Sequence, residues 1–253
     1  MPLLQDLADG FVDLVLGSAC VGCDRPGRPL CAGCRDGLPD GAALRRPSPC
    51  PPGLVATYSA GAYDGALRAL VLAHKERRVL SLARPLGEVL GAAVRAALDE
   101  AGAGPGDPVV LVPIPSRPAA VRQRGHDPTG AMVRRAATVV TETGRPATTA
   151  ALLRIRPGVV DQAGLGAEQR AANLAGSMAT SSAGLRRLAA RRARAHVVIC
   201  DDVLTTGATL REAQRALESV GVVPLAGATV AATRRRRAPP KVGPSLSSSP
   251  ATD

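Results

Sequence analysis

The segment Val197–Leu210, which reads VVICDDVLTTGATL, constrains the fold of this chain more than any other. Its first four residues are apolar and predict a buried strand, which Asp201 and Asp202 follow directly. The small residues Thr205–Thr209 then open a helix, whose first turn offers free backbone N–H groups and a positive dipole end to a phosphate. A plain strand–turn–helix with a threonine N-cap is the alternative. The acidic pair before the loop favours a phosphate-binding βα unit at the ligand edge of a sheet.

The rest of the chain alternates between strand and helix patterns. Strands are expected at 54–59, 109–113, 149–154, 196–200 and 222–232, and helices at 1–19, 62–73, 80–101, 128–143, 167–174, 185–194 and 210–220. This alternation predicts an α/β fold with a parallel sheet flanked by helices. Apolar residues make up 45% of the chain but only Phe11, Tyr58 and Tyr63 are aromatic, so the core must be packed from Ala, Val and Leu.

Two further segments place polar groups where a second phosphate group would lie. Val109–Pro118, VVLVPIPSRP, is a buried strand followed by a tight turn with Pro115, Ser116 and Arg117, whose guanidinium can donate to a pyrophosphate. Arg122 and Arg124 then stand before a glycine and can close over the same charge and exclude water. A proline-stiffened loop and a basic surface loop, neither with a ligand, are the alternatives.

A cysteine-rich stretch precedes these elements. Cys20 and Cys23 form one CxxC pair, and Cys31 and Cys34 form a second one seven residues later. Two such pairs complete a tetrahedral site of four sulfurs, so we expect a structural Zn²⁺ that supplies folding energy to a segment without a core. Disulfides, a redox CxxC motif and an iron–sulfur cluster are the alternatives. A further cysteine, Cys50, has no partner in this pattern.

Taken together, VVICDDVLTTGATL, VPIPSRP and the segment RQRGHD at 122–127 resemble the ComF family of competence-associated proteins. This resemblance implies a type I phosphoribosyltransferase fold, preceded by a zinc-finger-like module, that binds phosphoribosyl pyrophosphate (PRPP) with Mg²⁺. It implies catalytic roles for Asp201, Asp202 and Arg124. It implies PRPP contacts for Thr205, Thr206, Gly207, Ala208, Thr209, Pro115, Ser116, Arg117, Arg122 and Lys75. Gln162 and the Arg170–Asn173 stretch are similar to a further family motif.

We therefore expect three parts: a cysteine-rich zinc-binding module at 1–53, a phosphoribosyltransferase domain at 54–233 and a disordered basic tail at 234–253. The expected function is transfer of ribose-5-phosphate from PRPP with release of pyrophosphate, to an acceptor that the sequence does not identify. The alternative is a non-catalytic sensor of PRPP or nucleotides in DNA uptake, with single-stranded DNA or a helicase as partner. That alternative rests on the family, on the cysteine pairs and on the arginine-rich helix at 185–194.

The net charge of +11 suits a phosphate-bearing substrate as well as it suits DNA. The scarcity of aromatic side chains argues against stacking of unpaired bases. No apolar run reaches the roughly 20 residues that span a membrane. The first 20 residues have no positive start, and Asp6, Asp9 and Asp13 interrupt them, so we expect no export signal and a cytoplasmic location.

Overall fold

The computed structural model describes residues 19–156, 174, 176–191 and 194–234. The expected helices at 1–19 and 167–174 lie almost entirely outside the described residues. So do Gln162, the Arg170–Asn173 stretch and the tail beyond Arg234.

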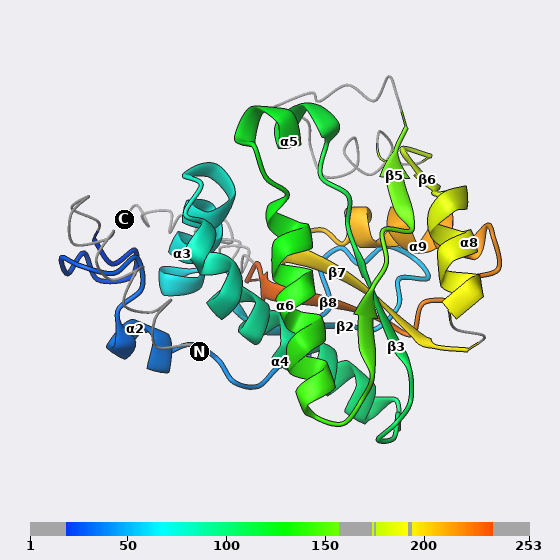
Figure 1. Cartoon of the computed structure of the whole chain (residues 1–253), viewed down its shortest axis with the longest axis horizontal. Coiled ribbons are helices and arrows are strands. Elements are labelled where there is room, and N and C mark those ends of the chain that lie inside the picture. The colour runs from blue at the N-terminus through cyan, green and yellow to red at the C-terminus, as the bar shows by residue number, and fades with distance from the viewer. Residues whose placement is uncertain (1–18, 157–173, 175, 192–193, 235–253) are drawn as a thin grey trace, which may run out of the picture.

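Strands of the described residues form a six-stranded sheet in the order β1-β2-β8-β7-β3-β4 (Figure 1). Their bounds are β1 Ala43–Leu44, β2 Thr57–Ala62, β3 Val109–Pro113, β4 Ala147–Thr149, β7 His196–Leu204 and β8 Ala226–Ala232. β1 pairs antiparallel with β2, and every other neighbouring pair is parallel. The expected α/β fold with a mostly parallel sheet is confirmed.

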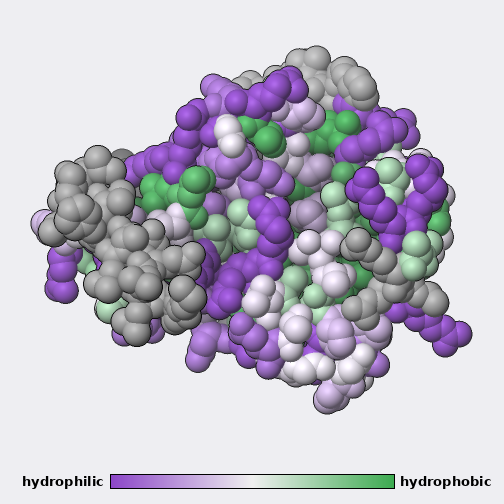
Figure 2. All heavy atoms as spheres, in the orientation of Figure 1, coloured by the Kyte–Doolittle hydropathy of each residue, from purple (hydrophilic) through white to green (hydrophobic). Residues whose placement is uncertain are grey.

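Helices cover both faces of this sheet. The described helices are α2 Ala32–Asp36, α3 Gly65–Glu76, α4 Ala83–Glu100, α5 Pro118–Arg124, α6 Pro128–Glu142, α8 Ser182–Arg191 and α9 Ala208–Glu218, with a 3-10 turn η1 Leu80–Leu82 before α4. Figure 1 shows α4 and α6 side by side in front of the sheet, with α9 behind it. Hydrophilic residues cover much of the front face (Figure 2).

The two faces bury different side chains because strand residues alternate in direction. On β3, Val109 and Leu111 join the core under α4 and α6, whereas Val110 and Val112 join the core under α9. The same alternation on β7 sends Val198 to the first core and Ile199 to the second. The central strands are thus apolar on both faces, as expected for a buried parallel sheet.

Close packing between α4 and α6 depends on two glycines. A Cβ atom at Gly87 would lie 2.5 Å from the Cβ of Arg135, and one at Gly91 would lie 2.8 Å from Cγ1 of Val139. These glycines are four residues apart and therefore face the same side of α4. A larger residue at either position would push the two helices apart.

The structure shifts several expected boundaries by two to four residues, and three further corrections change the elements themselves. The strand expected at 149–154 is two strands, because the chain turns at Ala150–Leu152 and leaves the main sheet. β5 Leu153–Ile155 then pairs antiparallel with β6 Met178–Thr180. β7 continues to Leu204 instead of ending at Cys200, because β8 pairs with it over this whole length.

The third correction concerns the segment after Arg117, where we expected a turn and loop. A proline at its first position and a left-handed glycine at its end, Gly125 with φ 75°, allow the helix α5 there. No helix within the described residues is long and apolar enough to cross a membrane.

Candidate functional site

The acidic pair lies on β7, and a lysine from α3 meets it. Lys75, in the last turn of α3, forms an ion pair with Oδ2 of Asp202. Asp202 is buried, with 6% of its surface exposed. Oδ1 of Asp201 accepts a hydrogen bond from the backbone N–H of Asp202 at 2.8 Å. The end of α3 and the middle of β7, 127 residues apart in the chain, are joined by this contact.

Burial and the neighbouring charges act in opposite directions on this cluster. Burial raises the pKa of Asp201 well above its ordinary value, and the charge of Asp202 raises it further, although Lys75 opposes both. Burial alone would lower the pKa of Lys75, but Asp202 raises it above its ordinary value. Lys75 is therefore held as a cation that neutralises one acid, while the other acid retains its proton to a higher pH than usual. The edge is less negative than two free carboxylates, which favours the approach of a phosphate.

Replacing Asp201 with asparagine is expected to stabilise the protein. Because the folded-state pKa of Asp201 is raised, folding binds a proton, and stability falls as pH rises through that pKa. The neutral isostere removes this cost. We expect the free energy of unfolding to rise by about 1 kcal/mol at pH 8, the size of a typical single stabilising change. Urea unfolding at pH 8 and pH 5 measures it, and the gain should shrink at the lower pH.

The matched control is Asp99→Asn, because Asp99 pairs with Arg145 outside this cluster and its loss should bring no gain at pH 8. An Asp201→Asn variant that is less stable than the parent at pH 8 would contradict the raised pKa.

A cavity of about 540 Å³ opens beside the acidic pair. It is lined by Tyr63, Val71, Leu72, Lys75, Glu76, Ile114, Pro115, Ser116, Arg117, Ala120, Arg124, Thr129, Asp201, Asp202, Val203, Thr205 and Thr209. These residues come from the carboxyl ends of β2, β3 and β7 and from α3, α5, α6 and α9. Ligands of parallel α/β sheets bind at this edge.

Most of the residues expected at the site thus meet in one place. The acids, the lysine, Arg124, Thr205, Thr209 and the Pro115–Arg117 turn all line the cavity. Thr206, Gly207, Ala208 and Arg122 do not belong to its lining.

The segment 47–54 packs against the loop that follows β7. Gly207 has φ 75° and precedes α9, a conformation that favours glycine. A Cβ atom there would lie 2.8 Å from Cδ2 of Leu54 and 2.9 Å from Cγ of Pro47. Thr206 accepts a hydrogen bond from the N–H of Ala208 at 3.4 Å. Gly207 therefore serves close approach of the 47–54 segment, a role that the sequence did not reveal.

Carboxylates hold two of the polar side chains that line the cavity in fixed positions. Arg124, at the end of α5, donates to both oxygens of Glu76 at 3.1 Å. Ser116 donates to Oδ1 of Asp127 at 3.0 Å, which joins the turn after β3 to the start of α6. Sequence reasoning missed Glu76 as a cavity residue, although its position directly after Lys75 was a usable signal.

Two histidines support the elements that carry Lys75 and Arg124. The ring nitrogens of buried His74 lie 3.1 Å from the carbonyl oxygen of Val79 and 3.3 Å from that of Pro128. Those of His126 lie 3.2 Å from the carbonyl oxygen of His74 and 3.3 Å from that of Arg124. Burial lowers the pKa of His74, which favours the neutral ring. The histidines fix α3 against the start of α6.

The four cysteines of the two CxxC pairs form a separate cluster. Their sulfur atoms all lie within 4.8 Å of one another, and those of Cys23 and Cys31 are 3.7 Å apart. A tetrahedron with zinc–sulfur bonds of about 2.3 Å has edges of about 3.8 Å, so the arrangement fits a metal bound by four thiolates. A Cβ atom at Gly22 would lie 2.9 Å from the sulfur of Cys34, so this glycine lets the backbone approach the cluster.

Backbone hydrogen bonds prepare one of these sulfurs as a ligand. Burial would raise the pKa of Cys20, but hydrogen bonds from the backbone of Cys31, Gly22 and Cys23 lower it to about 6. Hydrogen bonds with the other three cysteines raise the pKa of Cys34 to about 12. The four thiols share protons that a metal ion would displace. All six cysteines of the chain are free thiols.

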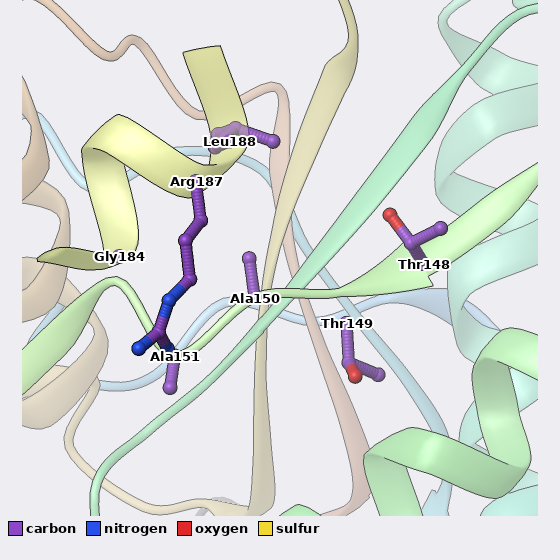
Figure 3. Close-up of a pocket in the computed structure, with 7 residues that line it drawn as sticks. All are labelled: Thr148, Thr149, Ala150, Ala151, Gly184, Arg187 and Leu188. Carbon is purple, nitrogen blue, oxygen red and sulfur yellow. The ribbon is translucent and has the colours of Figure 1, made fainter. Parts of the chain in front are cut away.

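Another cavity, of about 650 Å³, lies between α8 and the chain that joins β4 to β5 (Figure 3). The side chain of Arg187 extends from α8 toward Ala151. It is the one charged residue among those that line this cavity, which contains none of the expected site residues.

Residues 148–249 match the family model of the phosphoribosyl transferase domain. The match contains the acidic pair and the threonine loop. It begins after the cysteine cluster and also after Lys75, the Pro115–Arg117 turn and Arg124. A comparison with curated proteins finds no match. Together with the parallel sheet, the matched domain supports a type I phosphoribosyltransferase-like protein.

Proposed function

We propose that the protein binds PRPP and, with Mg²⁺, transfers its ribose-5-phosphate to an acceptor with release of pyrophosphate. One observation carries this proposal. The acidic pair and the threonines after β7 line the same cavity as the Pro115–Arg117 turn, Lys75 and Arg124. The cavity offers cationic and hydroxyl donors for two phosphate groups, with acceptors for sugar hydroxyls between them.

In this proposal each group of residues holds one part of PRPP. Thr205 and Thr209, with the backbone of the loop between them, bind the 5′-phosphate at the start of α9. Asp201 and Asp202 accept hydrogen bonds from the ribose hydroxyls. The Pro115–Arg117 turn binds the pyrophosphate, whose charge also attracts Lys75 and Arg124.

In the reaction, the acceptor's electron pair forms a bond to ribose C1 as the bond from C1 to the pyrophosphate oxygen breaks. That oxygen keeps the electron pair, so positive charge develops on the ribose and negative charge on the leaving group. Mg²⁺, brought with PRPP, would offset the negative charge. Asp202, next to the ribose, stabilises the positive one, and Arg117 the leaving group. When PRPP binds, the Arg124 guanidinium can leave the Glu76 carboxylate and donate its hydrogen bonds to the pyrophosphate instead.

We also propose that the four-cysteine cluster holds a structural Zn²⁺ and that the chain divides at about residue 53 into this module and the transferase domain, with β1 of the first part added to the sheet of the second. The sulfur spacing supports zinc. A cytoplasmic location is consistent with six unpaired thiols. The resemblance to the ComF family suggests a link to DNA uptake.

The test measures PRPP binding and turnover separately. Isothermal titration with PRPP and MgCl₂ should give micromolar to millimolar affinity, with ribose-5-phosphate binding more weakly because it lacks the pyrophosphate. Pyrophosphate release is then followed against a panel of nucleobases and other nitrogen nucleophiles. Release with any acceptor supports the transferase. Tight PRPP binding without release from the whole panel supports the sensor alternative, and no PRPP binding overturns both.

A further inference from the structure

A third cavity, of about 530 Å³, also lies at the strand ends, beside the 540 Å³ cavity in which we place PRPP, called the PRPP cavity below. It is lined by Leu44, Arg45, Arg46, Pro47, Gly61, Ala62, Leu204, Ala232, Thr233 and Arg234. These residues come from the ends of β2, β7 and β8, from the two residues after β8, and from β1 and the segment that follows it. A cavity of this volume accommodates a nucleotide-sized molecule.

The two cavities at this edge are neighbours with no lining residue in common. Leu204 lines the third cavity, whereas the next residue, Thr205, lines the PRPP cavity. Ala62 and Tyr63 divide in the same way. The ends of β2 and β7 therefore contribute neighbouring residues to two different spaces.

The charged residues that line the third cavity are all basic. Arg45, Arg46 and Arg234 line it, and no acidic residue does. Within the described part of the chain, Arg45 and Arg46 have no side-chain hydrogen bond or ion pair, whereas Arg234 pairs with Asp64 at 2.9 Å. No residue that the structure describes thus competes for these two guanidinium groups, and guanidinium binds phosphate through two parallel hydrogen bonds.

The backbone that carries these arginines is fixed. The N–H of Arg45 donates to the carbonyl oxygen of Thr57 at 2.7 Å, directly after the pairing of β1 with β2. Pro47 packs against Gly207 in the loop after β7. Leu44 and Leu204 provide an apolar wall for an uncharged portion of a ligand.

We propose that this cavity binds a second ligand, a phosphorylated small molecule of nucleotide size, through Arg45 and Arg46. Its phosphate lies on the two guanidinium groups, and its uncharged part lies against the apolar wall. Because Pro47 contacts both this cavity and Gly207, the bound ligand borders the loop that holds the 5′-phosphate of PRPP.

Calorimetric titration with adenosine monophosphate tests the proposal, with adenosine as the ligand that lacks the phosphate. The variant Arg45→Gln/Arg46→Gln should bind adenosine monophosphate about tenfold or more weakly, or lose one binding site, because each lost charged hydrogen bond is a large part of such an affinity. The control Arg186→Gln/Arg187→Gln removes the same charge from α8 and should bind like the parent. Thermal melts establish that both variants are folded.

Equal weakening in the two double variants would show a general charge effect and overturn the proposal. No binding of adenosine monophosphate by the parent protein, or equal affinity for adenosine, also overturns it. The result is independent of PRPP turnover. A parent protein that fails to bind PRPP, but whose adenosine monophosphate binding depends on Arg45 and Arg46, would disprove the transferase and leave the second site standing.

Discussion

The Asp202→Asn variant is expected to release pyrophosphate from PRPP about 10²- to 10³-fold more slowly than the parent, the usual effect of removing one group that stabilises transition-state charge. Asp202 forms the ion pair with Lys75 and is almost fully buried. An amide keeps the size but loses the charge. Lys75 is then left as a cation without its partner in a partly buried position.

The rate and the affinity separate the expected role from a structural one. If Asp202 stabilises developing positive charge on the ribose, kcat should fall much more than KM rises. Far-ultraviolet circular dichroism should show an unchanged fold, and Asp99→Asn, outside the cavity, should retain full activity. An Asp202→Asn variant with parental kcat would exclude this carboxylate from the chemistry.

If the proposed Zn²⁺ is bound, its chelation is expected to unfold residues 20–36 and leave the six-stranded sheet intact. Within the described residues, α2 has no buried residue, and Cys20 is the one buried hydrophobic side chain between 19 and 36. The segment therefore lacks a core of its own, although Val21 and Leu30 pack against the main core. The proposed metal would supply much of its folding free energy. Hydrogen exchange measures the result. After chelation, protection should disappear at Cys20 and Val21, whose N–H groups bond within the module, and should persist in β3 and β7.

Two cysteine variants provide the matched comparison. Cys23→Ser removes one of the four sulfurs and should weaken zinc binding by more than about 100-fold, since changes that merely disturb ligand orientation already cost about 10- to 100-fold. Cys50 is exposed and lies outside the cluster, so Cys50→Ser should bind one zinc per chain, like the parent. Equal zinc content in the two variants, measured by elemental mass spectrometry, would rule out the four-sulfur site.

The sequence predicted the central elements well because their signals are local. Val109–Pro113 has the bounds that were expected, since a short apolar run between prolines leaves little freedom in its ends. The strand before the acidic pair was also found, but its extension to Leu204 was not. That extension comes from pairing with β8, a contact that no local pattern records.

Contacts between distant segments account for the other differences. Arg124 lines the cavity, as expected, but no local pattern indicated its ion pair with Glu76, 48 residues away. The importance of Gly87 and Gly91 also depends on a neighbouring helix. Lys75 was recognised because it is one of two lysines in an arginine-rich chain. Its partner became evident when the end of α3 was placed beside β7.

The pairing of β1 with β2 has a consequence for how this protein behaves among its own copies. Unpaired backbone groups on an outer strand invite another chain to extend the sheet, and proteins commonly cover such borders. The two residues of β1 pair antiparallel with β2 and so cover part of its outer edge. A fragment that begins after residue 53 lacks β1, so the backbone N–H and C=O groups on that side of β2 would be unpaired. We expect such a fragment to self-associate more readily than the whole chain.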